Sequence, residues 1–244
     1  HPMSKIVNPR EIFSDITAAY RIAFGDDLVS IILYGSAAGS DYRPGKSDIN
    51  FLIVLSERAV GTLDAAIPVV ARWRKRGVAV PLFMTTRYIS SSLDSYPLEF
   101  LSMMRHYTVV YGVDVLAGLI VEPRNLRLQC EREIKGKLLL LRVGYLDAEG
   151  KPKRVQELMG ASITAFISIM SGLLHLKGLD IPPARRDLIG LAANHFALDP
   201  QAFLACLDMR EGKKKFSGDE VKDLFKSYLA EIEKLWESVD AMDA

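Results

Sequence analysis

The sequence has little net charge and few cysteines. Its 244 residues include 31 Lys and Arg against 30 Asp and Glu, which gives a formal charge of +1 at pH 7. A chain this close to neutral has no bulk electrostatic attraction to nucleic acid or to an anionic membrane surface. The two cysteines, Cys130 and Cys206, lack the spacing of a metal site, and two distant thiols do not make a disulfide framework. We expect both to be buried apolar residues.

One stretch, residues 158–176, lacks formal charge for long enough to approach the length of a membrane span. Serine, threonine, histidine and glycine dilute its apolar character, and the segments on either side are strongly charged. These features favour a central helix of a soluble bundle. No basic region followed by an apolar run occurs near the start, so we expect a cytoplasmic protein without membrane partners.

The sequence does contain a first half of mixed strand and helix patterns and a second half that is helical. Short apolar runs predict strands over residues 28–34, 49–55, 78–84 and 107–112. Helical spacing occupies 9–24 and 62–76, and the serine-rich residues 90–97 read as a loop. From residue 125 onward helical periodicity is interrupted only near 150–152, 178–183, 198–200 and 212–218. We therefore expect an α+β protein, with a sheet and flanking helices over 4–122 and a helical bundle over 123–244.

The segment between the first two predicted strands ends in Gly45-Lys46-Ser47, like the end of a phosphate-binding P-loop. Five residues separate Gly39 from Gly45, whereas that motif requires four. A P-loop also leads into a helix whose N-terminus holds phosphate, but this segment leads into a strand. Both differences exclude a P-loop.

A second interpretation uses the two ends of the same segment. One strand ends in Gly35-Ser36, and the next opens with Asp48-Ile49-Asn50. Residues two apart in a strand face the same side, so Asp48 and Asn50 project together. Backbone N–H groups at Gly35, Ser36 and Ala37 can hold a triphosphate opposite a metal at Asp48, because glycine at 35 lets phosphate approach without a Cβ in the way.

Leu33-Tyr34-Gly35-Ser36-Ala37-Ala38-Gly39 followed by Ser47-Asp48-Ile49-Asn50-Phe51-Leu52 resembles the nucleotidyltransferase superfamily. The arrangement is similar to that of aminoglycoside adenylyltransferases and minimal nucleotidyltransferases with a C-terminal helical domain. The resemblance implies a mixed sheet with flanking helices, followed by a helical bundle. It also implies binding of an NTP with Mg²⁺ in a cleft between two domains. The implied reaction transfers a nucleoside monophosphate to an acceptor hydroxyl and releases pyrophosphate.

The sequence departs from the superfamily's pattern at the metal-binding residues. The resemblance implies an Asp-x-Asp motif and a third carboxylate on a later strand, whereas this chain has Asp48 with Asn50 and no acidic residue over 78–84. An amide oxygen can coordinate Mg²⁺ but adds no charge, and phosphoryl transfer relies on charge neutralisation. We therefore predict that Asp48 and Asn50 are the catalytic residues and the ligands of a weak or single Mg²⁺. Transfer is predicted to be weak or lost, as in a regulatory pseudoenzyme, and Glu99 replaces the third acid only if the serine-rich loop folds back.

Arg43, Lys46 and Ser47 are predicted to contact phosphate, although each also has an interpretation as an ordinary turn residue. His106 is a candidate acid or base, but a lone histidine at the edge of an element is more often structural. Two alternatives stay open: an active enzyme that adenylylates a small-molecule or protein acceptor through a rearranged metal site, and a non-catalytic module for homodimerisation or partner binding. Nucleic acid is disfavoured as a partner because no aromatic residues interleave the basic runs.

Overall fold

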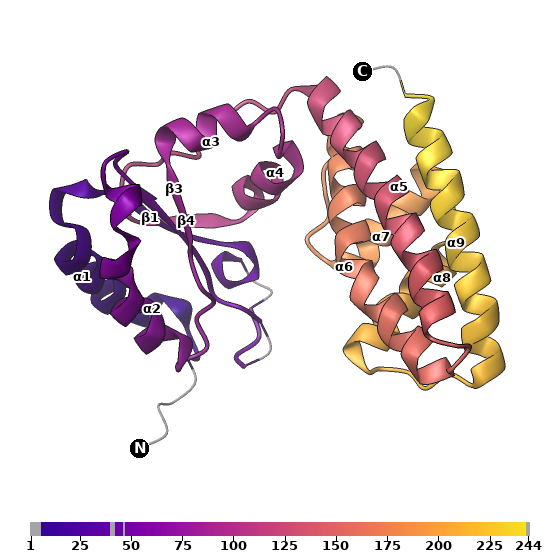
Figure 1. The fold of residues 1–244 in the computed structure, drawn as a ribbon. Coiled ribbons are helices and arrows are strands. Elements are labelled where there is room, and N and C mark those ends of the chain that lie inside the picture. The colour runs from indigo at the N-terminus through magenta and orange to yellow at the C-terminus, as the bar shows by residue number, and fades with distance from the viewer. Residues whose placement is uncertain (1–5, 40–41, 46, 243–244) are drawn as a thin grey trace. The chain divides into compact units, whose positions relative to one another are not determined.

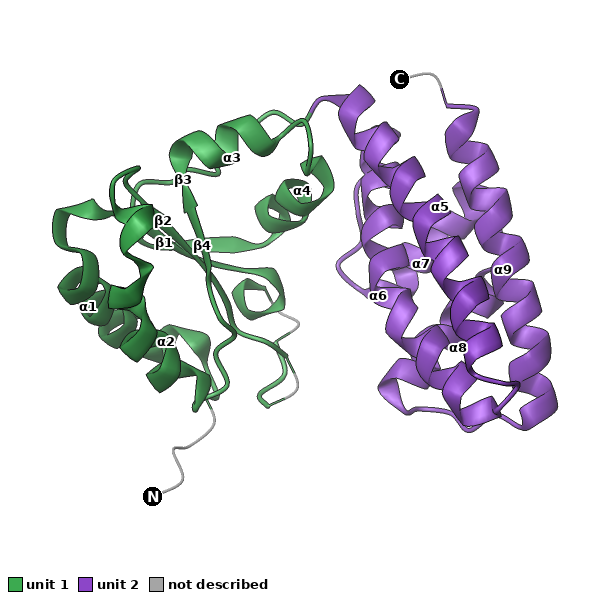
Figure 2. Cartoon of the chain, viewed as in Figure 1, with its two compact units in different colours: residues 1–121 green, residues 122–244 purple. Residues whose placement is uncertain are grey.

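A computed structural model describes residues 6–39, 42–45 and 47–242. The chain divides into two compact units, unit 1 (His1–Val121) and unit 2 (Glu122–Ala244), which Figure 2 shows in two colours. Unit 1 is a sheet with helices on both faces, and the described part of unit 2 contains helices and no strand (Figure 1). The fold class is therefore α+β, as the sequence predicted.

The sheet of unit 1 is mixed and has the strand order β3-β2-β1-β4. β1 (Leu28–Tyr34) pairs antiparallel with both β2 (Asn50–Leu55) and β4 (Tyr107–Gly112). β2 pairs parallel with β3 (Leu82–Thr85). A parallel pair needs a crossover connection, which here runs through η4 (Ala59–Ala66) and α2 (Ile67–Arg74).

The third strand begins later than predicted. Val78 forms only an isolated bridge with Ile49, and regular pairing starts at Leu82. Pro81 lies between them and has no backbone N–H to donate to a neighbouring strand. The predicted strand over 78–84 is therefore wrong in its first residues.

Two layers of helices cover the two faces of this sheet (Figure 1). α1 (Phe13–Phe24) follows η1 (Pro9–Ile12), whose N-cap Asn8 accepts a hydrogen bond from the Arg10 N–H. α1 and α2 pack on one face, and α3 (Thr86–Ser92) and α4 (Pro97–Arg105) pack on the other. Alternate residues of β2 enter the two cores, with Phe51 and Ile53 on the α1–α2 face and Leu52 on the α3–α4 face.

The serine-rich segment does not begin as a loop. α3 extends to Ser92, and Thr85 caps it by accepting a hydrogen bond from the Tyr88 N–H at 3.0 Å. The hydroxyl groups of Ser90 and Ser91 donate to carbonyl groups one turn earlier in the helix, a local bond that serine forms readily. The prediction of a loop over 90–97 is wrong for its first three residues and for Pro97, which begins α4.

Unit 2 contains five described helices: α5 (Pro123–Asp147), α6 (Pro152–Leu176), α7 (Arg185–His195), α8 (Pro200–Glu211) and α9 (Gly218–Asp240). Three of them begin with a proline, whose missing N–H would have no partner in the first turn. α9 begins with a capping box in which Ser217 and Glu220 bond each other's backbone N–H groups. The helix breaks lie where the sequence predicted them.

α6 is long and apolar enough to cross a membrane, judged by length and composition alone. However, 56% of its most apolar window is buried, and α6 contacts α5, α7, α8 and α9. A Cβ at Gly160 would lie only 3.1 Å from the backbone N of Arg210 in α8, so glycine permits this close approach. α6 is thus a central helix of the bundle, and Cys130 and Cys206 are buried as predicted.

Candidate functional site

Three strand ends meet at one edge of the unit 1 sheet. Tyr34, the last residue of β1, pairs with Asn50 on one side and with Tyr107 on the other. The chain then turns into η3 (Gly35–Ala38), and the Gly35 N–H donates a hydrogen bond to the His106 carbonyl at 2.9 Å. We call this place the Gly35 edge, which comprises Gly35, Ser36, Asp48, Asn50 and His106.

Gly35 has a backbone conformation that favours glycine. Its φ is +77°, in the left-handed region where other residues are strained. A Cβ built on Gly35 would lie 3.7 Å from Nδ2 of Asn50, an ordinary contact distance. The turn after β1 and the start of β2 are therefore direct neighbours. Because the Gly35 N–H is bonded to His106, the donors that this turn can offer to a ligand begin at Ser36.

Asp48 and Asn50 flank a buried residue. Ile49 lies in the core on the α1–α2 face of the sheet. By strand alternation Asn50, the first residue of β2, lies toward the α3–α4 face, and Asp48 precedes the strand. Asp48 is exposed and Asn50 is half-buried. The pair thus combines one solvent-accessible carboxylate with one partly enclosed amide.

The loop before Asp48 is closed by two hydrogen bonds between Arg43 and Ser47. The Arg43 N–H donates to Ser47 Oγ at 3.0 Å, and the Ser47 N–H donates to the Arg43 carbonyl at 2.9 Å. Tyr42 anchors the loop because its hydroxyl donates to the Ile6 carbonyl at 2.8 Å. The Ser47 hydroxyl therefore stabilises the turn, and the Arg43 side chain is exposed. Lys46, also predicted to contact phosphate, lies outside the described residues.

His106 contacts both ends of the η3 turn. Its carbonyl accepts the hydrogen bond from the Gly35 N–H, and its ring lies beside Gly39, where an added Cβ would be 3.5 Å from Cγ of His106. The sequence favoured a structural role for this histidine because a lone histidine at the edge of an element is more often structural. The only indication in the sequence that His106 lies near Gly35 was its position just before the fourth strand. That position places it beside Gly35 only because β4 pairs with β1.

The residues at the Gly35 edge do not fit a metal site built from several carboxylates. Among the residues that the structure describes, no group of three or more His, Cys, Asp or Glu side chains can hold a metal ion. Glu99 lies exposed in the first turn of α4, which contacts η3, but it does not complete such a group with Asp48. Two-metal phosphoryl transfer needs more anionic ligands than one aspartate and one amide supply. The described residues therefore lack the ligands of a two-metal site.

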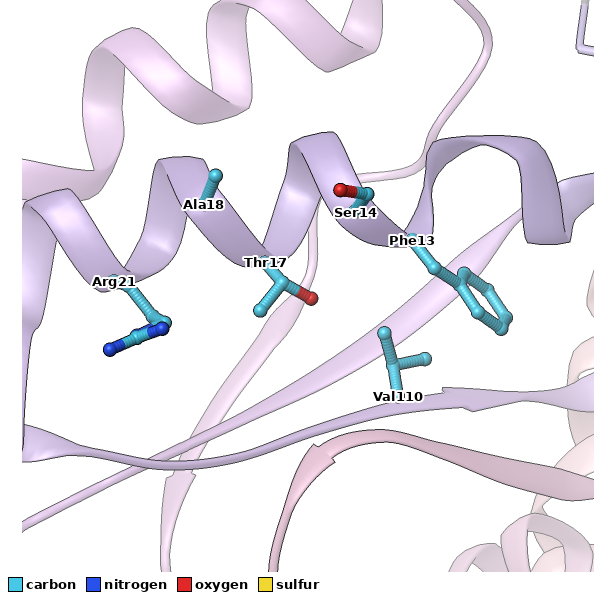
Figure 3. A pocket seen from close by; sticks show the side chains of 6 residues that line it. All are labelled: Phe13, Ser14, Thr17, Ala18, Arg21 and Val110. Atoms are coloured by element: carbon cyan, nitrogen blue, oxygen red, sulfur yellow. The ribbon is translucent and has the colours of Figure 1, made fainter.

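A pocket of about 400 Å³ lies elsewhere in unit 1, between α1 and β4 (Figure 3). Phe13 and Val110 point toward each other across it, and the Arg21 guanidinium lies 5.7 Å from the centre of the Tyr111 ring. Val110 packs with the core of the α1–α2 face, whereas Asn50 lies toward the opposite face. None of the residues lining this pocket belongs to the Gly35 edge; they are Phe13, Ser14, Thr17, Ala18, Arg21 and Val110.

No protein-family profile matches the chain, and no curated protein matches it in sequence. Among solved structures it is similar to spectinomycin adenyltransferase AAD(9) from Enterococcus faecialis, solved with ATP and spectinomycin. The match has a TM-score of 0.58 at 13% sequence identity and covers 93% of this chain and 100% of that one. At this identity the likeness concerns the fold. The chain therefore shares the fold of AAD(9), a sheet unit followed by helices as the sequence predicted.

Proposed function

We propose that the chain binds a nucleoside triphosphate at the Gly35 edge and that nucleotidyl transfer there is weak or lost. The observation that carries the proposal is the close approach of the Gly35 turn to Asn50. A Cβ added to Gly35 would lie 3.7 Å from Nδ2 of Asn50. It supports a shared role for two motifs that lie fifteen residues apart in the sequence. ATP is the first nucleotide to test, because the structurally similar AAD(9) was solved with ATP.

The proposed phosphate contacts come from the η3 turn and the loop before Asp48. The backbone N–H of Ser36 and its hydroxyl are donors at the start of η3, where no earlier carbonyl in the turn accepts from them. The exposed side chain of Arg43 adds a cation that suits a phosphate oxygen. These groups bind and orient a polyphosphate without requiring any covalent chemistry of the protein.

The weakness of transfer follows from the charge of the site. Mg²⁺, when bound with the nucleotide, supplies charge neutralisation for phosphoryl transfer. Asp48 would provide its one anionic protein ligand and Asn50 a neutral one. Positioning and charge neutralisation supply almost all of the rate in this chemistry, so the missing carboxylates should cost orders of magnitude. A site that binds nucleotide but transfers it poorly is suited to sensing nucleotide.

The proposal is tested by thermal unfolding of the full chain with millimolar ATP, GTP, CTP or UTP, each with and without Mg²⁺. A ligand at about 100 times its Kd adds about 2.7 kcal/mol to the stability of the folded state. We expect a shift with at least one NTP and a larger shift with Mg²⁺. Asp48→Asn should remove the extra effect of Mg²⁺, and Asp94→Asn, at an exposed aspartate in the same unit, should not. The absence of any shift would contradict nucleotide binding.

A second candidate is an active nucleotidyltransferase with a small-molecule or protein acceptor. The position of His106 favours it, because an imidazole beside the phosphate-binding turn can accept the proton of an acceptor hydroxyl. Pyrophosphate release with ATP and Mg²⁺ distinguishes the candidates, with spectinomycin as the first acceptor and cell extract as a source of others. Release that depends on His106, and is lost in His106→Ala but kept in His175→Ala, would favour the enzyme over the sensor.

A further inference from the structure

α5 is apolar on two sides. One side faces the bundle, where Ile134, Leu138 and Leu141 are buried and α5 contacts α6 and α9. The other side faces outward and carries four large apolar side chains that are between 61% and 76% exposed: Leu139, Leu140, Val143 and Leu146. Successive residues of a helix are rotated by about 100° about its axis, so these four residues and Gly136 fall within an arc of about 120°. We call these five residues the α5 stripe. A contiguous apolar face of this kind on a helix marks an interaction surface.

The stripe has a charge of opposite sign at each end. Arg132 is exposed at one end and has no ion-pair partner within the described ranges. Asp147 lies at the other end, with a side chain that is 77% exposed although Arg154 binds it at 2.7 Å. The other cations along this part of α5 are already paired with carboxylates of unit 2, namely Lys135, Lys137 and Arg142. Arg132, unpaired among the described residues, and Asp147, whose carboxylate stays largely exposed beside Arg154, are therefore the two end charges that we assign to contacts with a partner.

We propose that the α5 stripe binds the α5 stripe of a second copy of this chain, with the two helices antiparallel about a twofold axis near Leu139 and Leu140. A twofold contact is self-complementary, so each residue meets a residue equally far from the axis on the other side. Arg132 then faces Asp147 of the second copy, twice in the dimer. Gly136 faces Val143 of the second copy.

The shape of the stripe agrees with this register. A Cβ added to Gly136 would meet no atom within 4 Å, so this position is an open notch on the helix surface. Val143 projects from the surface with 65% of its area exposed. A notch opposite a projecting side chain lets two helices approach closely. Shape and charge are thus both self-complementary about the same axis.

The oligomeric state of the full chain tests the proposal, measured by sedimentation equilibrium over a wide range of concentrations. We expect a dimer that Val143→Glu converts to monomer. The matched control is Val113→Glu, because Val113 is 62% exposed in unit 1 and lies off the stripe; it should leave the dimer intact. A wild-type chain that stays monomeric throughout would overturn the proposal, since the stripe would then be covered within one chain or by another molecule.

Charge reversal tests the register. Arg132→Glu and Asp147→Arg each place like charges opposite each other at two symmetric positions, so each should weaken the dimer about tenfold. The double variant restores opposite charges across the axis and should recover most of the affinity. Failure of the double variant to recover would exclude the antiparallel register.

Cross-linking gives an independent readout. Cys130 and Cys206 are both buried, so a cysteine introduced at Leu140 is the accessible thiol in the described residues. Leu140→Cys should give a covalent dimer with a short bismaleimide, because the proposed axis passes beside it, and Val113→Cys should not. A wild-type dimer in which Leu140→Cys fails to cross-link would place the interface elsewhere and overturn the proposal. Nucleotide binding is measured separately, so either inference can fail without the other.

Discussion

Asn50→Asp is the substitution that most directly tests the electrostatics of the Gly35 edge. It adds a second carboxylate at the first residue of β2, two residues after Asp48, and the alternation of a strand predicts that both face the same side. At a rise of about 3.3 Å per residue, the two positions are about 6.6 Å apart. Two unit charges at that distance repel by about 2.5 kcal/mol at an effective dielectric constant of 20, and by about 0.6 kcal/mol in bulk water. Because Asp48 is exposed, the smaller value applies most closely.

Because of this repulsion, we expect the stability of Asn50→Asp to depend on Mg²⁺ more strongly than that of the parent chain. With a chelator and at low salt, Asn50→Asp should melt about 2 °C below the parent, since about 1 kcal/mol shifts the melting temperature of a domain this size by roughly 4 °C. Millimolar Mg²⁺ should reverse the difference, because a dication between two carboxylates removes their repulsion. Pyrophosphate release from an NTP should also rise.

The assay uses the two tryptophans of the chain, one in each unit. Trp73 is buried in unit 1 and Trp236 lies in α9 of unit 2, so Trp73 reports on unit 1 alone in a Trp236→Phe background. Ser14→Asp, at an exposed position in α1 of the same unit, is the matched control for the added charge. The double variant Asp48→Asn with Asn50→Asp keeps a single carboxylate and should show no added Mg²⁺ dependence. Equal Mg²⁺ dependence of Asn50→Asp and the parent would refute the shared face of residues 48 and 50.

Three further outcomes concern stability. Gly112→Ala should destabilise unit 1 by about 3 kcal/mol in urea unfolding, because the φ of Gly112 is +79° and a Cβ would lie 2.0 Å from the Val29 carbonyl oxygen. Gly61→Ala is the control, because a Cβ there meets no atom within 4 Å. Equal destabilisation by the two substitutions would contradict this prediction. Hydrogen bonds from Arg58 and then Ser56 lower the pKa of Asp27. The stabilisation from this lowered pKa is present above pH 3.8, the ordinary pKa of an aspartate, and is lost as the pH falls through the lowered pKa. Arg58→Ala should therefore make the free energy of unfolding depend less steeply on pH in acid. An unchanged pH dependence in acid would count against a stabilising Arg58–Asp27 pair. Ser217→Ala should lower the free energy of unfolding of unit 2 by about 1 kcal/mol, because it removes the capping box of α9. Ser238→Ala, inside the same helix, should lower it by less. Urea unfolding followed by circular dichroism measures both.

Much of the fold was predictable because it depends on residues close together in the chain. The bounds of β1 and β4, the N-cap at Asn8 and the helix breaks of unit 2 all follow from patterns within a few residues. The errors arose where a local pattern had two interpretations. Pro81 interrupted an apolar run that otherwise indicated a strand, and serines that often belong to loops bonded back to their own helix.

The candidate site was predictable only in part for the same physical reason. The sequence by itself determined that a Gly-Ser turn, one aspartate and one asparagine stand at two strand ends, and that no acid replaces Asn50 on the next strand. Only the tertiary structure decided that β4 lies beside β1 and brings His106 against both ends of η3, and that one apolar side of α5 is left outside the bundle. Strand order and helix orientation result from burying the apolar faces of the whole unit together, a balance over many distant residues that no short segment contains.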